Sequence, residues 1–374
     1  MTTTKTIIGL TGNIATGKSV VRHMLTNAGA LGLDADVIAH RLYYQNGPAY
    51  QKVIDTFGPD ILSEDGQISR QKLGKTVFSD AKKLRTLEAI LHPLVTESIL
   101  RHINQSQTPI IVIEAIKLFE AGVDQICDKV WVSQASNDVQ LARLMQNRKL
   151  TKQAAMLRLE SQTSQIEKRK QADVVINTES SFFDTWQEVI QVLNDTIQTQ
   201  DEQFFLNLNT SQGLIGQPAG RVPGQRLANF WVQHTRRDLD ELYELLGSRL
   251  IITLQQDQAI KGMAIWQEWN FTANLKQMII AESAHEFADK LLKAFEEQSG
   301  IQQCEILLIP PARLQAYDLN LSDLGYDNLP TDELYFLPWR TIGRTITQDK
   351  SGRVWVKILN NPLEDLAQKN NMIL

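Results

Sequence analysis

The segment from Gly12 to Ser19 constrains the fold more than any other part of this chain. It reads Gly-Asn-Ile-Ala-Thr-Gly-Lys-Ser and satisfies the pattern G-x-x-x-x-G-K-S/T. The apolar run Thr6–Thr11 precedes it, and an amphipathic segment that stops at Gly29 follows it. We therefore expect a buried strand, a tight turn and a helix in this order, which is the context that a phosphate-binding loop requires.

The chemistry of this loop follows from its residue types. The two glycines let the backbone turn tightly, so that successive N–H groups point inward at anionic oxygens. The helix that follows adds the partial positive charge of its N-terminus. Lys18 is expected to neutralise the β- and γ-phosphates, and the Ser19 hydroxyl is expected to bind Mg²⁺. The pattern thus predicts nucleotide binding and leaves the second substrate open.

Residues 1–200 are predicted to form one α/β domain with a parallel sheet. Short apolar runs at Ile110–Glu114, Lys129–Val132 and Asp173–Ile176 alternate with helical patterns. Strands that alternate with helices in this way are typical of parallel sheets.

Two acidic residues, Asp34 and Asp36, follow a further apolar run at Ala30–Leu33. The carboxyl ends of parallel strands share one edge of a sheet, so these carboxylates are expected beside the phosphate-binding loop. One of them could accept the proton of an attacking hydroxyl, or hold that hydroxyl in line with the γ-phosphate. Alternatively, both could cap the N-terminus of the helix that follows.

The second half of the chain is predicted to be a separate α+β domain over residues 226–374. The segment 201–225 is expected to be a linker, because its later part is rich in Gly, Pro, Ser and Asn. Beyond it, one helix and three strand-like runs precede an amphipathic helix at Ala284–Gln298 and a strand at Cys304–Ile309. Residues 344–359 alternate on both sides of Asp-Lys-Ser-Gly, which predicts a hairpin.

Composition excludes several classes of protein. The chain has 374 residues, for which two domains are expected, and 38 Lys and Arg against 43 Asp and Glu give a net charge of −5. Neither half has the basic excess of a nucleic-acid-binding protein. We expect no membrane-spanning helix and no signal sequence, and hence a cytoplasmic protein. Cys127 and Cys304 match no zinc-site spacing and are expected to be reduced thiols.

Residues 5 to about 195 resemble the dephospho-coenzyme A kinases. The P-loop, its Gly-ended helix and the Asp34-Ala35-Asp36 segment follow one another as they do in that family. Further family markers come in the same order along the chain: Phe57-Gly58, Leu91-His92-Pro93-Leu94, Leu118-Phe119-Glu120-Ala121-Gly122, Gln140-Leu141-Ala142-Arg143-Leu144 with Arg148, Arg158 and Gln162, and Ala172-Asp173-Val174-Val175-Ile176-Asn177.

The resemblance implies a P-loop kinase fold with a helical lid, and ATP- and Mg²⁺-dependent phosphorylation of the 3′-hydroxyl of dephospho-CoA. Asp36 matches the catalytic aspartate, and Arg148 lies in the lid, where family arginines approach the transferred phosphoryl group. Asn177 lies in the segment near the adenine, whereas His92 is either an acceptor-side or a structural residue. The implied ATP site consists of Gly12, Asn13, Ile14, Ala15, Thr16, Gly17, Lys18, Ser19 and, through its backbone N–H alone, Val20.

Two departures from the family pattern open alternatives. Ala15 replaces a glycine of the loop, and a positive φ there would cost of order 1 kcal/mol. Ile116-Lys117 stands where the family has Pro-Leu, at a strand end that lines the acceptor pocket. The chain could therefore be a related kinase with another nucleoside or nucleotide acceptor. It could also be a weakened, nucleotide-binding regulator whose output is the C-terminal module.

Residues from about 225 to 330 weakly resemble the N-acetyltransferase superfamily in their order of helices and strands. That family binds the acyl-CoA pyrophosphate in a glycine-rich turn before its long helix. Here the turn carries no glycine, and Glu282 and Glu286 would repel an anion. We therefore expect an acetyltransferase-like module that lacks the acyl-CoA phosphate loop and serves in binding or as a scaffold.

Overall fold

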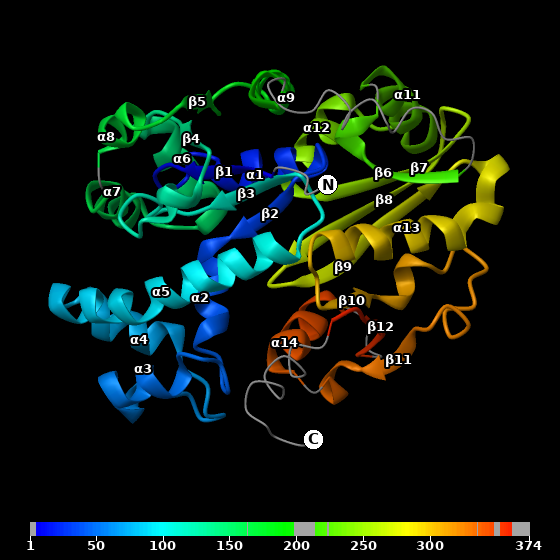
Figure 1. Ribbon diagram of the computed structural model, residues 1–374. Coiled ribbons are helices and arrows are strands. Elements are labelled where there is room, and N and C mark those ends of the chain that lie inside the picture. The colour runs from blue at the N-terminus through cyan, green and yellow to red at the C-terminus, as the bar shows by residue number, and fades with distance from the viewer. Residues whose placement is uncertain are drawn as a thin grey trace.

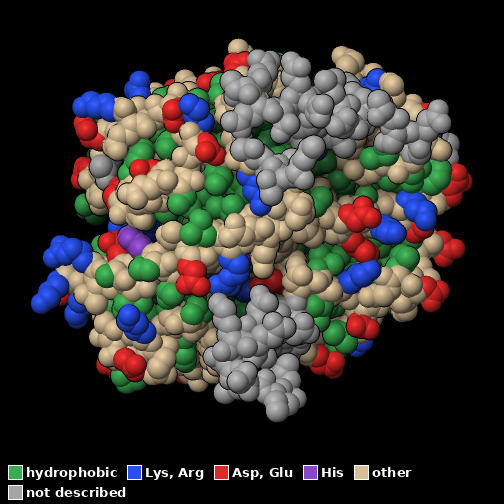
Figure 2. Space-filling view, viewed as in Figure 1, with side chains coloured by type: hydrophobic (Ala, Val, Ile, Leu, Met, Phe, Trp, Pro, Cys, Tyr) green, Lys and Arg blue, Asp and Glu red, His purple; other side chains and the backbone are tan. Residues whose placement is uncertain are grey.

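The structure, a computed structural model, describes residues 5–162, 164–197, 214–222, 224–334, 336–347 and 352–360. Figure 1 shows two β-sheets beside each other, one in each half of the chain, with helix α1 between them. No helix among these residues combines the length and the apolar character that crossing a lipid bilayer demands. On the face shown in Figure 2, acidic and basic side chains of the described residues are interspersed.

The sheet of the first half is fully parallel, as predicted. Its strand order is β2-β3-β1-β4-β5. All five residues of β3 are buried, as are the last four of β1, which explains their nearly continuous apolar sequences. The strands are β1 (Thr6–Thr11), β2 (Leu31–Asp34), β3 (Ile110–Glu114), β4 (Lys129–Gln134) and β5 (Val174–Asn177).

Helices cover both faces of this sheet. Side chains of α1 (Lys18–Asn27) and α9 (Phe182–Ile197) pack on one face, and those of α2 (Ala35–Leu42) and α5 (Ala81–Gln105) pack on the other. The remaining elements of this half are α3 (Tyr50–Phe57), η1 (Pro59–Ile61), α4 (Arg70–Phe78), η2 (Val123–Ile126), α6 (Asn137–Arg148), α7 (Lys152–Glu160) and α8 (Gln165–Lys170).

The second half contains a mixed sheet of seven strands in the order β11-β12-β10-β9-β8-β7-β6. All neighbours are antiparallel except β9 and β10, which are parallel. The strands are β6 (Leu214–Pro218), β7 (Leu250–Gln256), β8 (Ala259–Trp269), β9 (Thr272–Ile280), β10 (Ile306–Ile309), β11 (Asp327–Pro330) and β12 (Arg353–Ile358). The helices are α11 (Gly224–Thr235), α12 (Leu239–Ser248), α13 (Ala288–Ile301) and α14 (Leu337–Ile346), with short helices η3 (Ala219–Arg221), η4 (Glu282–Phe287), η5 (Pro311–Arg313) and η6 (Thr331–Glu333).

Two sequence-based expectations for the second half differ from the structure. The expected linker, 201–225, lies outside the described residues up to 213, and its remainder includes β6, an edge strand paired with β7. The expected hairpin over 344–359 is wrong. Its first arm continues helix α14, and β12 pairs instead with β10 and β11. Alternation of small polar and apolar residues in a short segment does not distinguish a strand from an amphipathic helix end.

The two halves meet along α1, which is buried at most of its positions. The Asn27 side chain makes three hydrogen bonds to the second half: its amide donates to the carbonyls of Leu246 and Arg249, and its oxygen accepts from the N–H of Ile251. The Gln302 side chain bonds to the backbone of Ala30 and Gly32 at distances of 2.9 and 3.1 Å. The second half therefore supplies hydrogen bonds that the first half needs for its own buried polar groups.

A cationic contact joins the halves near α2. The guanidinium of Arg41 pairs with Glu305 and lies over the rings of Phe271 and Phe336. Phe271 also stacks on His102 of α5, with ring centroids 5.2 Å apart. Arg41 and its two aromatic partners combine a salt bridge with cation–π contacts in a largely dehydrated place.

The largely buried imidazole of His23 makes the stability of the chain depend on pH. Burial, and then the charge of Arg22, lowers the pKa of His23 to about 3 from an ordinary value of 6.5. Below pH 6.5 the unfolded chain binds a proton at His23 that the folded chain does not bind until about pH 3. Stability from the neutral imidazole is therefore complete above pH 6.5 and decreases as the pH falls.

We predict that His23→Leu, which is similar in size and does not titrate, weakens this dependence. Between about pH 6.5 and pH 3 the free energy of unfolding of the unsubstituted chain should fall more steeply, by about 1.4 kcal/mol per pH unit, than that of the variant. Urea unfolding at a series of pH values measures the difference. Parallel curves for the two proteins would contradict the prediction.

Candidate active site

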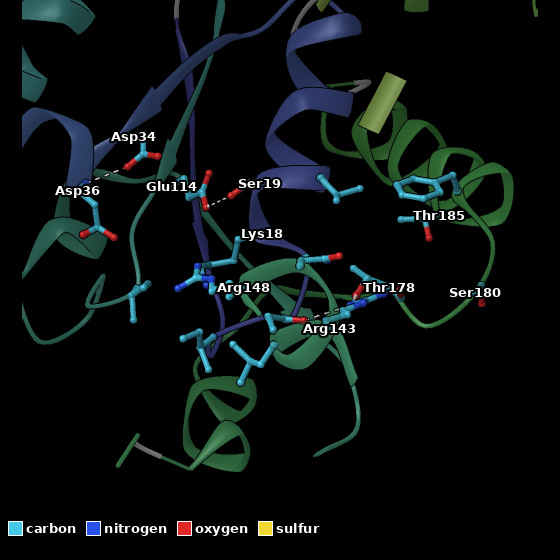
Figure 3. A pocket seen from close by; sticks show the side chains of 18 residues that line it. Lys18, Ser19, Asp34, Asp36, Glu114, Arg143, Arg148, Thr178, Ser180 and Thr185 are labelled. Carbon is cyan, nitrogen blue, oxygen red and sulfur yellow. Dashed lines mark hydrogen bonds between the residues drawn. The ribbon is translucent and has the colours of Figure 1, made fainter. Parts of the chain in front are cut away.

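A cavity of about 400 Å³ opens at the carboxyl edge of the parallel sheet. Figure 3 shows the labelled side chains, which come from the P-loop, β2, α2, β3, α6, the segment after β5 and α9. Its lining consists of Ile14, Ala15, Gly17, Lys18, Ser19, Val20, Asp34, Asp36, Glu114, Ile116, Arg143, Leu144, Asn147, Arg148, Thr178, Ser180, Phe182 and Thr185. Parallel strands bring these residues together because their carboxyl ends share one edge.

The loop before α1 depends on its two glycines. Gly12 has φ +150° and Gly17 has φ +86°, and a Cβ at either position would lie 2.6 Å from Ser133 or 2.9 Å from Thr178. Ala15 has φ +59°, so the departure at this position places a Cβ in the left-handed region. Ala15 would be free of strain only at a negative φ, so its backbone is strained.

Lys18 folds back over its own loop. Its ammonium donates to the carbonyls of Gly12 and Asn13 at 3.0 and 2.9 Å, and the side chain is almost fully buried. Burial lowers the pKa of Lys18 to about 8, an effect that the charge of Glu114 opposes. The ammonium is therefore still protonated at neutral pH and lies against the carbonyl oxygens of its own loop.

Glu114, at the end of β3, connects the loop helix to the sheet. Its Oε1 accepts a hydrogen bond of 2.8 Å from the Ser19 hydroxyl, and its Oε2 accepts one of 2.8 Å from Nε of Arg22 (Figure 3 shows the Ser19 contact). Burial alone would lower the pKa of Arg22, but the charges of Glu114 and then Glu268 hold it above its ordinary value. A hydroxyl and a carboxylate placed in this way are oxygen ligands of the kind Mg²⁺ prefers.

Asp34 and Asp36 differ in what they contact. Asp34 caps α2: its Oδ1 accepts from the N–H groups of Asp36 and Val37 at 2.9 and 3.1 Å. The Asp36 side chain is exposed to the cavity, and its carboxylate accepts no hydrogen bond from the described residues. Asp34 was expected either to handle the proton of the acceptor or to cap a helix, and its contacts fit the helix cap.

Both carboxyl groups bind protons more tightly than an ordinary aspartate. Desolvation, and then the negative charge of Glu114, raises the pKa of Asp34 to about 7. The same two causes raise the pKa of Asp36, although solvent reaches its side chain through the cavity. A carboxylate with a raised pKa is a better proton acceptor at neutral pH.

The lid residues occupy different places. Arg148, at the end of α6, lines the cavity beside Lys18 (Figure 3), and its charge contributes to the lowered pKa of Lys18. Gln162 reaches the loop, where its side-chain oxygen accepts a hydrogen bond of 2.7 Å from the N–H of Ile14. Asn177 does not line the cavity; its side-chain oxygen accepts from the N–H of Glu179 at 3.0 Å.

The two residues that depart from the family pattern on the acceptor side, Ile116 and Lys117, have different surroundings. Ile116 lines the cavity, and its carbonyl accepts hydrogen bonds from Thr11 and Lys168. Lys117 turns away to pair with Glu88 on α5 and is not part of the lining. His92, also on α5, lies outside the lining as well.

The first half of the chain matches a family of known proteins. The dephospho-CoA kinase family model matches residues 6–184. A dephospho-CoA kinase of Carboxydothermus hydrogenoformans is 43% identical over 190 residues, which make up 50% of this chain and 92% of that protein. The chain belongs to the dephospho-CoA kinase family. A relative of the same name from Bacillus licheniformis is 40% identical over 191 residues, with 50% of this chain and 95% of that protein covered.

Solved structures also match each half. The dephospho-CoA kinase from Campylobacter jejuni is 30% identical, with a TM-score of 0.40 over 52% of this chain and 98% of that one. An acetyltransferase of the GNAT family from Staphylococcus aureus is 15% identical, with a TM-score of 0.28 over 40% of this chain and 99% of that one. The curated dephospho-CoA kinases account for about half of this chain, so the second sheet is an addition to the part they match.

Two residues at the site, Glu114 and Arg143, were not predicted from the sequence as functional residues. Glu114 closes an apolar run just as Asp34 does, and an acid at the end of a buried strand was the signal that could have found it. Arg143 donates to the carbonyl of Ala15 and to the Thr178 hydroxyl at 3.2 and 3.1 Å, and so connects the loop to the segment after β5. Arg143 belongs to the family marker Gln140-Leu141-Ala142-Arg143-Leu144, but its position in that marker did not indicate that its side chain contacts the loop.

The backbone strain at Ala15 predicts a stabilising substitution. Ala15→Gly removes a Cβ from the left-handed region, and we expect the free energy of unfolding to rise by about 0.5–1 kcal/mol. Ala28→Gly is the matched control, because Ala28 has φ −78° and gains nothing from glycine. It should lower the stability, since glycine loses more backbone entropy on folding. Urea unfolding measures both, and equal losses would show that Ala15 is not strained.

Proposed function

We propose that this protein transfers the γ-phosphoryl group of ATP to the 3′-hydroxyl of dephospho-CoA, which yields coenzyme A. Membership of the kinase family supports this reaction. The observation that supports it most directly is the arrangement of residues around one cavity. The phosphate-binding loop with Lys18 and Ser19 forms one side of that cavity, and the carboxylate of Asp36 opens into it from α2. A phosphoryl donor and a hydroxyl acceptor can thus meet between them.

In this proposal the loop binds the triphosphate of ATP. Backbone N–H groups of the loop surround the phosphates, apart from those of Ile14 and Thr16, which donate to Gln162 and to the carbonyl of Asn13. The N-terminus of α1 adds its partial positive charge. The ammonium of Lys18, held at the loop by two carbonyls, neutralises the β- and γ-phosphates. Arg148 adds a second positive charge beside it, where charge develops on the transferred group.

Mg²⁺ is a proposed cofactor, and the residues present fit it. Ser19 offers its hydroxyl and Glu114 its carboxylate, and bound Mg²⁺ would neutralise charge on the phosphates. Among the described residues no group of three or more His, Cys, Asp and Glu could hold a metal ion. In the proposed site the two side chains and the nucleotide phosphates would share the ion.

Asp36 is the proposed proton acceptor. Its exposed carboxylate and raised pKa suit removal of the proton from the acceptor hydroxyl as that oxygen attacks. Asp34 has another task, because its side chain is used to cap α2 and so fixes the position of Asp36. Asn177 is proposed to act near the adenine only through the segment that it begins, since Thr178 and Ser180 line the cavity.

The chain is proposed to consist of a kinase domain over 1–200 and an acetyltransferase-like domain over 226–374. That the second domain lacks an acyl-CoA phosphate loop remains a prediction, motivated by Glu282 and Glu286 before α13. The free cysteines, Cys127 and Cys304, suit the reducing cytoplasm that we propose as its location.

Turnover with a panel of acceptors tests the reaction. The pure protein with ATP and Mg²⁺ should phosphorylate dephospho-CoA and not adenosine, AMP or pantetheine phosphate, with product identity read by mass spectrometry. Ile116 lines the cavity where the family has proline, so transfer to another acceptor would replace the proposed substrate while keeping the kinase. Binding of ATP without any transfer would favour a regulator.

The division of labour between the two aspartates gives a second prediction. Asp36→Asn keeps the shape but cannot accept a proton, and kcat should fall by about 10²–10⁴-fold with little change in ATP affinity. Asp34→Asn is its matched control. Asparagine caps helices as well as aspartate does, so this variant should retain most of the activity. Steady-state kinetics of the two variants decide, and a large loss in Asp34→Asn alone would reverse the assignment.

A further inference from the structure

Glu268 brings a second carboxylate from the other domain to the guanidinium of Arg22. Glu268 lies near the end of β8, and its Oε2 is 3.7 Å from Nη1 of Arg22. Its other oxygen accepts a hydrogen bond of 3.1 Å from the N–H of Phe271, which holds the carboxylate in place. The Arg22 and Glu268 side chains are only 8% and 16% exposed, so solvent screens this contact weakly.

Arg22 already has a partner in Glu114, so Glu268 is not needed to neutralise it. A second buried carboxylate costs desolvation energy, and its attraction to Arg22 offsets only part of that cost because Glu114 already compensates the charge. What the second carboxylate changes is the distribution of the charge. With Arg22 shared between Glu114 and Glu268, Glu114 keeps more of its negative charge on Oε1, which accepts from Ser19 at 2.8 Å.

We infer that Glu268 is a positioning residue for the P-loop, acting across the domain interface through Arg22 and Glu114 on the hydroxyl of Ser19. Without Glu268, the positive charge of Arg22 would act on Glu114 alone, so less negative charge would remain on the oxygen of Glu114 that accepts from Ser19. The hydrogen bond that holds the Ser19 hydroxyl would then weaken. The second domain is thus part of the phosphate-binding site of the kinase without touching the nucleotide.

This inference rests on the proposed ATP site, and the experiment measures ATP binding to the full-length chain by titration calorimetry. The unsubstituted protein is measured first, and its failure to bind ATP would overturn both proposals. Glu268→Gln removes the charge and keeps the shape, and it should weaken ATP binding roughly tenfold, as expected for residues coupled in one network. Loss of dephospho-CoA turnover with ATP binding intact would reject the proposed reaction alone.

Two controls separate positioning from a general role at the interface. Gln302→Ala removes interface hydrogen bonds to Ala30 and Gly32 but has no contact with Arg22, and its ATP affinity should stay within about twofold of the unsubstituted protein. In a Ser19→Ala background, Glu268→Gln should have no further effect, because the hydroxyl it acts on is gone. An equal loss in Gln302→Ala, or an undiminished loss in the Ser19→Ala background, would overturn the inference.

Glu268→Asp keeps the proposal testable if the glutamine variant does not fold. It preserves the charge but shortens the side chain by one methylene, so its ATP affinity should be intermediate and should depend on Ser19 in the same way. Full affinity in Glu268→Asp, together with an unfolded Glu268→Gln, would show that Glu268 only supports the fold. Unchanged affinity in a folded Glu268→Gln would overturn the inference directly.

Discussion

Burial of the P-loop helix on almost every side is the constraint on which the rest of the structure depends. Helix α1 carries Lys18 and Ser19 at its start and Arg22, His23 and Asn27 further along, yet most of its positions are buried. Polar groups removed from water must find partners inside the protein. Glu114, from the parallel sheet, serves Arg22, and backbone groups of the second domain serve Asn27. The two sheets are therefore not independent neighbours.

The same constraint connects the carboxyl edge of the parallel sheet to the interface between the halves. The charge of Glu114, the partner of Arg22, contributes to the raised pKa of Asp34 and of Asp36 and opposes the lowering of the pKa of Lys18. Gly32 in β2 leaves room for two side chains of α1, because a Cβ there would lie 2.5 Å from the Thr26 hydroxyl and 3.3 Å from the Cγ of Arg22. A glycine in a strand is usually unfavourable, and here it leaves space for a buried charge.

The sequence was sufficient for the part of the site that local chemistry determines. The loop from Gly12 to Ser19, the parallel sheet and the position of the two aspartates could be predicted because strand, turn and helix signals adjoin one another there. The distinct contacts of Asp34 and Asp36 could not, since either carboxylate can cap a helix and only side-chain direction separates them. The left-handed φ of Ala15 was not predictable either, because it results from the loop as a whole.

Contacts between segments far apart in the chain could not be predicted from the sequence for a different reason. Glu268 lies on an apolar strand whose pattern predicts a sheet but not which helix of the other half it meets. The hairpin expected over 344–359 failed similarly: strand β12 does form, but its partners are distant strands and not the preceding segment. Periodicity describes one element at a time, whereas these contacts depend on how two separate cores are packed together.

The dependence of α1 on distant residues has a consequence for synthesis of the chain on the ribosome. The hydrogen-bond partners of Asn27 come 219 to 224 residues later. At elongation rates of about 5–20 residues per second they emerge roughly ten to forty seconds after α1. Until then the Asn27 side chain lacks all three of these partners. Completion of the buried contacts around the end of α1 therefore has to wait for translation of the second half.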